Sequence, residues 1–385
     1  HTRYWRDWSS DVCSSDLDVL ARIKEIPDQT VQCVVTSPPY WGLRDYGHDG
    51  QLGLEPTPQA YVENMVAVFR EVRRILKDDG VLWLNLGDSY NGSGGAGGDY
   101  SLGGLKEGQP KYPGRNVATL KPKDLAGIPW RVAFALQDDG WWLRQDIIWH
   151  KPNPMPESVT DRCTKAHEYL FMLTKSAKYY FDNQAIKEPA ETSNTGHRFG
   201  GNKYGDSDDP FHRTKGETYI ATGFRNKRSV WSIPPKPFRG AHFAVMPEAL
   251  CEPPILASTS EAGQCLQCGK NLIRVLKKGN IPERKTRNNT LGVVPGRNKT
   301  TRLNSVDMIT IPKKTVGWSP TCDCPDVSAE PNVVFDPFTG SGTVATVALR
   351  HGRNYLGIEL NPEYVTIAQN RITDDQPMLN ETEIR

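Results

Sequence analysis

Two short apolar runs with a helical segment between them constrain the fold of this chain more than any other feature. Val31–Thr36 is rich in β-branched residues, Val81–Leu86 is mostly apolar, and both have the length of buried strands. Between them, apolar residues recur at spacings of three and four from Pro58 to Lys77, and we expect Asp78-Asp79-Gly80 to end this helix. A strand, a helix and a strand in this order form a parallel crossover unit. The sequence therefore predicts an α/β fold.

The composition is that of a folded protein with two or three structural units. Of the 385 residues, 24% are charged and 37% are hydrophobic, and the net charge is only +2. A nucleic-acid partner would therefore have to contact local basic patches. No apolar run approaches membrane-spanning length, and the first residues show no secretion signal. We expect a cytoplasmic protein with no membrane partner.

Residues 1–17 are expected to be a leader foreign to the rest of the chain. The stretch from Arg3 to Leu17 is similar to translated sequencing-adapter sequence and has no clear strand or helix pattern. The regular pattern begins at Asp18, so the leader is excluded from the functional argument.

A proline-rich motif directly follows the first expected strand. Ser37-Pro38-Pro39-Tyr40 would lie at the carboxyl edge of a parallel sheet, where loops hold substrates. The two prolines restrain the backbone, so the preceding carbonyl can accept a hydrogen bond from a base amine, and Ser37 can supply a second acceptor. Tyr40 offers an aromatic face to a base that has left the duplex. The alternative is a Pro-Pro turn without chemistry.

A glycine-rich turn lies near the other end of the chain. The strand Val333–Asp336 is followed by Pro337-Phe338-Thr339-Gly340-Ser341-Gly342-Thr343, the helix Val344–Arg350 and the strand Asn354–Ile358. Glycines in such a turn let a ligand approach the backbone closely. Glu359 stands nineteen residues past Gly340, a distance that suits contact with a ribose diol. A nucleotide-binding dehydrogenase is the generic alternative.

Four of the eight cysteines form two close pairs, Cys265/Cys268 and Cys322/Cys324. In a reducing compartment this clustering favours a metal over disulfides. The two pairs could supply a tetrahedral four-thiolate zinc site, with Gly269 in the turn after the first pair. Reduced thiols without a metal are the alternative.

Two polar stretches are expected to be insertions. Glu191 to Arg228 has little periodicity, and Lys270 to Arg302 holds ten Lys or Arg residues against the single acid Glu283. We expect the second stretch to attract the phosphate backbone of a nucleic acid, with a solvated loop as the alternative.

Together, the motifs resemble those of the DNA amino-methyltransferases. That family combines an Asp/Ser/Asn-Pro-Pro-Tyr element with an Asp-Pro-Phe-x-Gly-x-Gly-Thr element, and here the first precedes the second, as in its β class. Three more segments are similar to conserved regions of the family, and they are Trp149-His150-Lys151-Pro152-Asn153-Pro154, His167-Glu168 and Ala241-His242-Phe243-Ala244-Val245-Met246-Pro247. One difference is Ser15-Asp16, which stands near the place of the family's Gly-Asp pair.

The resemblance implies a Rossmann-like, doubly wound sheet and methyl transfer from S-adenosylmethionine to an exocyclic base amine in double-stranded DNA. It assigns chemistry to Ser37, Pro38, Pro39 and Tyr40, and cofactor binding to Asp336, Pro337, Phe338, Gly340, Gly342, Thr343, Glu359 and His242. Ser-Pro-Pro-Tyr is similar to the cytosine-N4 signature, so cytosine N4 is the expected target and adenine N6 the close alternative. No Cys follows a Pro in a nucleophile loop, which counts against covalent cytosine-C5 methylation.

Other readings stay open at this point. The chain could be a zinc-containing DNA-binding protein with an impaired methyltransferase core, or it could methylate RNA, protein or a small molecule. A cognate restriction endonuclease could accompany it, or none. Residues 18–190 are expected to form the catalytic half and 191–230 a target-recognition insertion. Residues 231–258 and 329–385 are expected to form the cofactor half, and 259–328 a basic, zinc-ribbon-like insertion.

Overall fold

A computed structural model describes residues 19–43, 50–92, 117–154, 156–157, 159–189, 224–235, 245–278 and 313–375. The chain divides into two compact units. The first comprises the described residues up to 185, 228–273 and 320 onward, and the second comprises those in 186–227 and 274–319. Within the described part of the chain, no helix is both long enough and apolar enough to cross a membrane.

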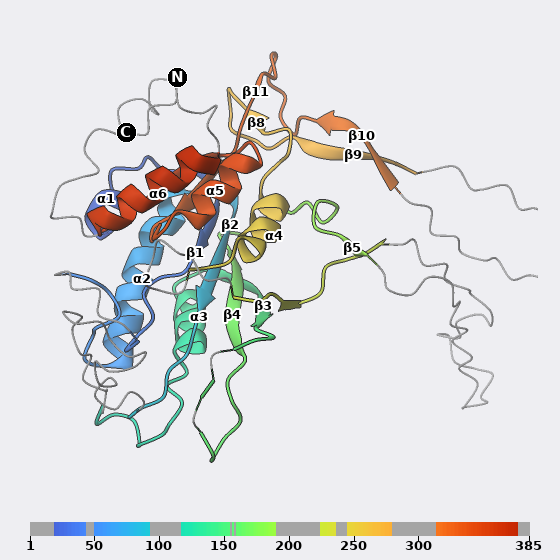
Figure 1. The fold of residues 1–385 in the computed structure, drawn as a ribbon. Helices are drawn as coiled ribbons and strands as arrows, with labels where there is room; N and C mark the ends of the chain where they lie inside the picture. Colours follow the sequence, from blue (N-terminus) through green and yellow to red (C-terminus); the bar gives the residue numbers. More distant parts are fainter. Residues whose placement is uncertain are drawn as a thin grey trace, which may run out of the picture. The chain divides into compact units, whose positions relative to one another are not determined.

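A seven-stranded sheet forms the centre of the first unit (Figure 1). Its strand order is β13-β12-β1-β2-β4-β3-β7. The strands are β1 (Val31–Thr36), β2 (Leu76–Leu86), β3 (Trp142–His150), β4 (His167–Thr174), β7 (Val230–Ser232), β12 (Val333–Asp336) and β13 (Asn354–Gly357). Of these seven, only β4 runs antiparallel to its neighbours β2 and β3.

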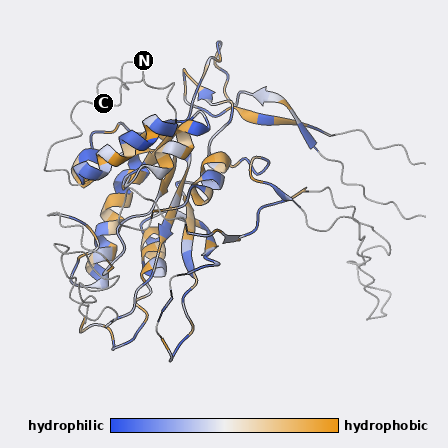
Figure 2. Ribbon diagram, in the orientation of Figure 1, coloured by the Kyte–Doolittle hydropathy of each residue, from blue (hydrophilic) through white to orange (hydrophobic). Residues whose placement is uncertain are grey.

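Helices cover both faces of this sheet. They are α1 (Val19–Ile23), α2 (Pro58–Ile75), α3 (Ile128–Asp138), α4 (Glu248–Ser258), α5 (Thr343–Arg350) and α6 (Pro362–Asp375). Val34 and Leu82 pack in one core with α1, α2 and α3, whereas Cys33 and Trp83 pack in a second core with α4 and α5. Successive strand residues point to opposite faces, and Figure 2 shows apolar residues along the central strands. The predicted doubly wound α/β fold is confirmed.

The boundary between α2 and β2 differs from the sequence expectation. We expected Asp78-Asp79-Gly80 to separate a helix from a strand, but α2 ends at Ile75 and β2 starts at Leu76. Leu76 has extended dihedrals (φ −72°, ψ 138°), is buried and pairs with Val31. A side chain at Gly80 would meet the Leu76 side chain at 2.6 Å. The helix ends early because Leu76 already pairs with Val31 in the sheet. Asp78-Asp79-Gly80 lie within β2 at an irregularity, where the partners of Val31 and Cys33 are Leu76 and Val81.

Three two-stranded sheets complete the described structure. In the first unit, β8 (Gln264–Cys265) pairs with β11 (Ala329–Glu330). In the second unit, β5 (Glu188–Pro189) pairs with β6 (Phe224–Arg225), and β9 (Ile273–Lys278) pairs with β10 (Lys313–Ser319). Most of the expected basic stretch Lys270 to Arg302, most of the expected recognition insertion and the leader 1–17 lie outside the described residues.

Candidate active site

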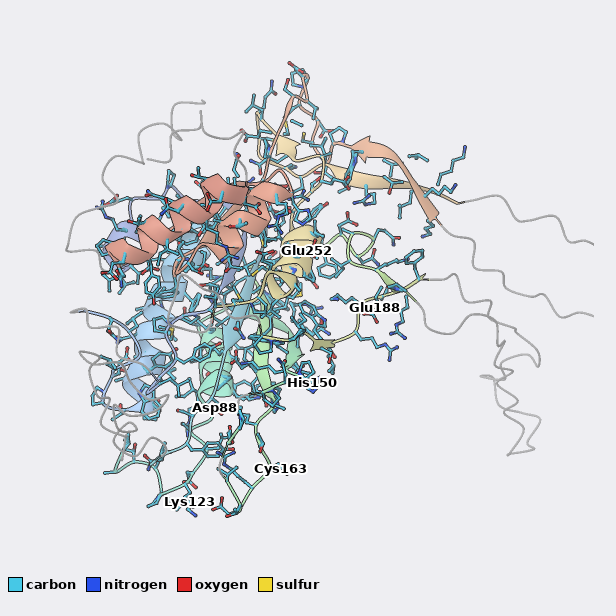
Figure 3. All side chains as sticks on the ribbon, in the orientation of Figure 1. Asp88, Lys123, His150, Cys163, Glu188 and Glu252 are labelled. Atoms are coloured by element: carbon cyan, nitrogen blue, oxygen red, sulfur yellow. The ribbon has the colours of Figure 1, made fainter. Side chains whose placement is uncertain are left out.

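The strand order reverses between β1 and β12. From β1 the chain continues to β2 on one side, and from β12 it continues to β13 on the other. In doubly wound sheets, ligands bind beyond the carboxyl ends of the strands at such a point. A cavity of about 460 Å³ lies there, within the usual range for small-molecule sites. Figure 3 shows Asp88, just after β2, and His150, the last residue of β3, at this same end of the sheet.

The proline-rich motif forms part of the cavity wall. Ser37, Pro38, Pro39 and Tyr40 all line the cavity. The hydroxyl of Tyr61, on α2, donates to the Pro39 carbonyl at 2.9 Å. This bond uses one of the two lone pairs of the Pro39 carbonyl, so Ser37 and the carbonyls that precede Pro39 are the acceptors of the motif that we consider for a ligand.

The hydroxyl of Tyr40 lies in a hydrogen-bonded cluster. It is 2.8 Å from Glu168 Oε2 and 2.9 Å from Asn85 Oδ1, and it accepts from Ser37 Oγ at 3.2 Å. Burial and the neighbouring Glu168 carboxylate raise the pKa of Tyr40 well above its ordinary value. The phenol therefore keeps its proton. Its ring packs against Gly87, where a Cβ would lie 2.5 Å from Tyr40 Cε2.

A charged pair lies beside this cluster. Lys151 Nζ donates to Glu168 Oε1 and lies 4.3 Å from the centre of the Trp149 ring. Asn85 Nδ2 donates to the Tyr169 carbonyl at 3.0 Å, which fixes the amide. Asn85, Trp149, Lys151 and Glu168 all line the cavity.

These four residues are functional candidates that the sequence reasoning did not include among the site residues. Trp149, Lys151 and Glu168 stood in segments similar to conserved regions of the family, which was the available signal. Asn85 could have been found as the one polar residue in the apolar run Val81–Leu86. All four lie in or just beyond strand ends, so the sheet brings them together from three separate segments.

Asp336 connects the two motifs. It is the last residue of β12, and its Oδ1 accepts from Thr36 Oγ1 at 2.6 Å and from the Phe338 amide at 3.0 Å. No hydrogen bond from the described residues reaches Oδ2. Burial raises the pKa of this carboxyl to about 7, opposed by the hydrogen bonds from Thr36 and Phe338 and assisted by the charge of Glu359.

The glycine-rich turn after β12 forms the opposite wall. Asp336, Pro337, Phe338, Gly340, Thr343 and Glu359 line the cavity. Glu359 Oε2 accepts from the Gly340 amide at 2.7 Å, and Oε1 accepts from the Asn361 amide at 2.9 Å. The predicted acid thus holds the turn itself together as well as facing the cavity.

Two of the residues expected to bind the cofactor, Gly342 and His242, are not among the described residues that line the cavity. Gly342 precedes α5 with φ 77°, and a Cβ there would lie 2.8 Å from the Ala368 Cβ of α6. It is absent from the described cavity lining, and its lack of a side chain lets α5 and α6 pack closely. His242 lies outside the described residues.

The two cysteine pairs come together in the first unit. The sulfurs of Cys265, Cys268, Cys322 and Cys324 all lie within 4.8 Å of one another. Bonds of about 2.3 Å to a tetrahedral zinc ion would set sulfur–sulfur distances of about 3.8 Å, so the four thiols fit this ion. The Gly269 amide donates to the Cys265 carbonyl at 2.8 Å, and Gly269 has φ 71°, which a tight turn between ligands requires.

A buried polar network joins this cysteine cluster to the sheet. Lys77 Nζ, on β2, donates to the Gly269 carbonyl at 2.9 Å and to the side chain of Gln264. Asn332, just before β12, donates to Gln264 Oε1 at 2.8 Å and to Asn271 Oδ1 at 2.7 Å. The turn that carries Cys265 and Cys268 is therefore fixed to the strand edges that support the active site.

Comparisons with known proteins show which family this sequence matches. A family model described as "DNA methylase" matches residues 31–268 and 326–370. The Type II methyltransferase M.Cfr9I of Citrobacter freundii is 40% identical over 362 residues, which cover 92% of this chain and 85% of that protein. The Type II methyltransferase M.XycI of Xanthomonas campestris pv. cyanopsidis is 41% identical with the same coverage.

Solved structures are more distant. The PvuII DNA methyltransferase (cytosine-N4-specific) is 16% identical, with a TM-score of 0.49 over 95% of this chain and 92% of that chain. The family match covers both motifs of the cavity, and relatives at about 40% identity span most of both chains. This chain belongs to the family of DNA methylases that act on adenine N6 or cytosine N4.

Proposed function

We propose that this protein transfers a methyl group from S-adenosylmethionine to cytosine N4 in double-stranded DNA. The observation that carries the proposal is the hydrogen bond from Thr36 to Asp336, which joins the serine motif and the glycine-rich turn in one cavity. S-adenosylmethionine would supply an electrophilic methyl group on a sulfonium. The wall formed by Asp336, Gly340 and Glu359 would hold the donor, with its ribose diol at Glu359.

The opposite wall would hold the base. Ser37 Oγ and a backbone carbonyl before Pro39 would accept the two amine hydrogens, which favours a more tetrahedral and more nucleophilic nitrogen. Tyr40 and Trp149 supply aromatic surface for a flipped base, worth about 1–3 kcal/mol per stacked base. Positioning of the amine against the methyl carbon is the main source of the rate enhancement in this proposal.

Cytosine N4 is proposed over adenine N6 because Ser37-Pro38-Pro39-Tyr40 resembles the cytosine-N4 signature of the family. The Ser37 hydroxyl, which donates to Tyr40, could accept from either amine. Adenine N6 remains the alternative target. The names of the curated relatives further support a role in DNA modification beside a restriction endonuclease, and that partner is part of the proposal.

The four clustered cysteines suit a structural metal site. We assign zinc to Cys265, Cys268, Cys322 and Cys324, because four thiolates form a closed site without an open catalytic position. We further propose that residues 191–230 recognise the target sequence and that residues 270–302 attract the phosphate backbone of DNA.

The first prediction concerns the methylated base. Double-stranded DNA incubated with the full chain and S-adenosylmethionine should yield N4-methylcytosine in a nucleoside digest, measured by mass spectrometry. Ser37→Ala should lower the single-turnover rate about tenfold to a hundredfold, since one lost hydrogen-bond acceptor costs on the order of 1–3 kcal/mol. Detection of N6-methyladenine instead would show that adenine is the target base. If Ser37→Ala methylated DNA at the wild-type rate, the proline-rich motif would have no chemical role and would be only a turn.

The second prediction concerns pH. Asp336 has a raised pKa of about 7, so its carboxyl is neutral below that pH and cannot attract the cationic donor. S-adenosylmethionine affinity, measured by calorimetry, should therefore rise between about pH 6 and about pH 8 as the carboxylate forms. In the protein without ligand, the raised pKa of Asp336 affects the free energy of unfolding in the opposite sense. The folded state is stabilised at low pH, where Asp336 is protonated, and this contribution is lost as the pH rises towards about 7. The Asp336→Asn variant should bind S-adenosylmethionine weakly and without this pH dependence. The same pH dependence of the affinity in the variant and the wild type would contradict the role of Asp336 in donor binding.

The third prediction concerns zinc. Elemental analysis of the purified chain should find about one zinc per molecule, and chelation should lower the melting temperature by at least about 5 °C, because binding of a structural zinc contributes to folding. Cys268→Ser should lose the metal. Cys163→Ser is the matched control, since Cys163 is exposed and outside the cluster. If the purified wild-type protein contained no zinc and its melting temperature did not change with the chelator, the four cysteines would be thiols without a metal.

A further inference from the structure

We propose that Tyr40 and Glu168 form a relay that removes the proton released by the target amine during methylation. The proposal rests on the proposed function in one respect, namely that Ser37 contacts the amine. It holds equally for cytosine N4 and adenine N6, because both amines lose a proton when they are methylated.

The hydrogen bonds run in one direction from the motif to a carboxylate. Ser37 Oγ donates to the Tyr40 hydroxyl at 3.2 Å, and this hydroxyl lies 2.8 Å from Glu168 Oε2. Since Ser37 uses its hydrogen towards Tyr40, its lone pairs remain free to accept from a base amine. Glu168 is the first group in this chain that can keep a proton.

Neighbouring groups prepare Glu168 for this role. The ammonium of Lys151 bonds to Glu168 Oε1 and balances the charge of the carboxylate, while Oε2 accepts from Tyr40. Asn85 Oδ1 is a competing acceptor 2.9 Å from the Tyr40 hydroxyl, but an amide oxygen cannot retain the proton at neutral pH. The charged pair is mostly shielded, with side chains 21% and 16% exposed, so bulk water is a poor alternative acceptor before the base leaves.

The step balances in atoms and charge. As the amine nitrogen forms its bond to the methyl carbon, the carbon–sulfur bond breaks and its electron pair stays on sulfur. The nitrogen then recovers the electron pair of one N–H bond while that proton passes to Ser37 Oγ. The Ser37 proton passes to the Tyr40 hydroxyl, and the Tyr40 proton to Glu168, which ends as a neutral acid and later releases its proton to water.

A carboxylate is a strong enough base for this task. The lone pair of the exocyclic amine is delocalised into the ring of the base. The methylated amino group, while it still carries both of its protons and a positive charge, is therefore a far stronger acid than a carboxylic acid. Burial keeps Tyr40 from becoming a phenolate, so its proton leaves only as another arrives.

The test is a pair of variants measured in single turnover at saturating DNA and S-adenosylmethionine. Glu168→Gln still accepts a hydrogen bond from Tyr40 but cannot take its proton, and Tyr40→Phe keeps the ring but breaks the chain. Each should slow methyl transfer about a hundredfold, with S-adenosylmethionine affinity nearly unchanged, and the double variant should be no slower than either one. Glu168→Asp, which keeps the acid, should recover part of the rate.

The pH–rate profile separates a relay from a merely structural contact. The relay needs an ionised carboxylate at position 168, so the pH dependence of the single-turnover rate should differ between the wild type and Glu168→Gln. The titratable groups around Glu168 are Tyr40, Lys151, Lys165 and His167, and their own charged neighbours are Asp88, Glu157 and His150. The Glu168 charge raises the pKa of Lys165 and of His167, so Glu168→Gln also changes the titration of these two groups. Tyr40→Phe keeps Glu168 and all of its charged neighbours, and its profile should also differ from that of the wild type if the relay operates.

Controls keep the outcomes distinct. Glu252→Gln removes a surface carboxylate paired with His351 and should leave the rate unchanged. If Glu168→Gln fails to fold because Lys151 is left unpaired, Tyr40→Phe and the double change Glu168→Gln with Lys151→Gln still decide the question. Wild-type rates and an unchanged pH profile in these variants would overturn the relay while the proposed function stands. A wild-type chain that methylates no base amine would overturn the proposed function, and the relay with it.

Discussion

The hydrogen bond between Thr36 Oγ1 and Asp336 Oδ1, 2.6 Å long, joins the ends of the two parallel strands on which the site depends. The two residues are 300 positions apart in the chain. Because β1 leads to β2 on one side and β12 leads to β13 on the other, no further strand separates their two loops. The serine motif and the glycine-rich turn must therefore open into one cavity, whatever the intervening insertions do.

This junction also explains the charges of the site. Asp336 is buried at the strand end, where its ionised form is costly, and a cationic ligand would offset that cost. On the other wall, Lys151 pairs with the Glu168 carboxylate beside the buried, protonated Tyr40. One wall therefore suits a cationic donor, and the other combines hydrogen-bond acceptors with a base.

Much of this arrangement could be predicted from local sequence. The apolar run Val31–Thr36, the motif after it and the glycine turn after Asp336 gave the fold class and both walls of the cavity. Glu168 and Lys151 could not be placed, because Glu168 reaches the cavity on β4, the antiparallel strand between β2 and β3, and Lys151 follows β3 directly. The order of strands in a sheet is not encoded in periodicity. Leu76 shows the same limit, since α2 ends where Leu76 pairs with Val31 of β1 and not at the turn-forming Asp78-Asp79-Gly80.

The central claim is that one junction holds the methyl donor and the target amine in line. The most direct measurement is a structure of the full chain with double-stranded DNA and an unreactive donor analogue that carries an amine in place of the methyl sulfonium. The account predicts the analogue against Asp336 and Glu359, a flipped base with its amine at Ser37, and a separation of about 3–3.5 Å between the reacting positions. A donor bound away from the β12 turn, or a base amine directed away from Ser37, would contradict it.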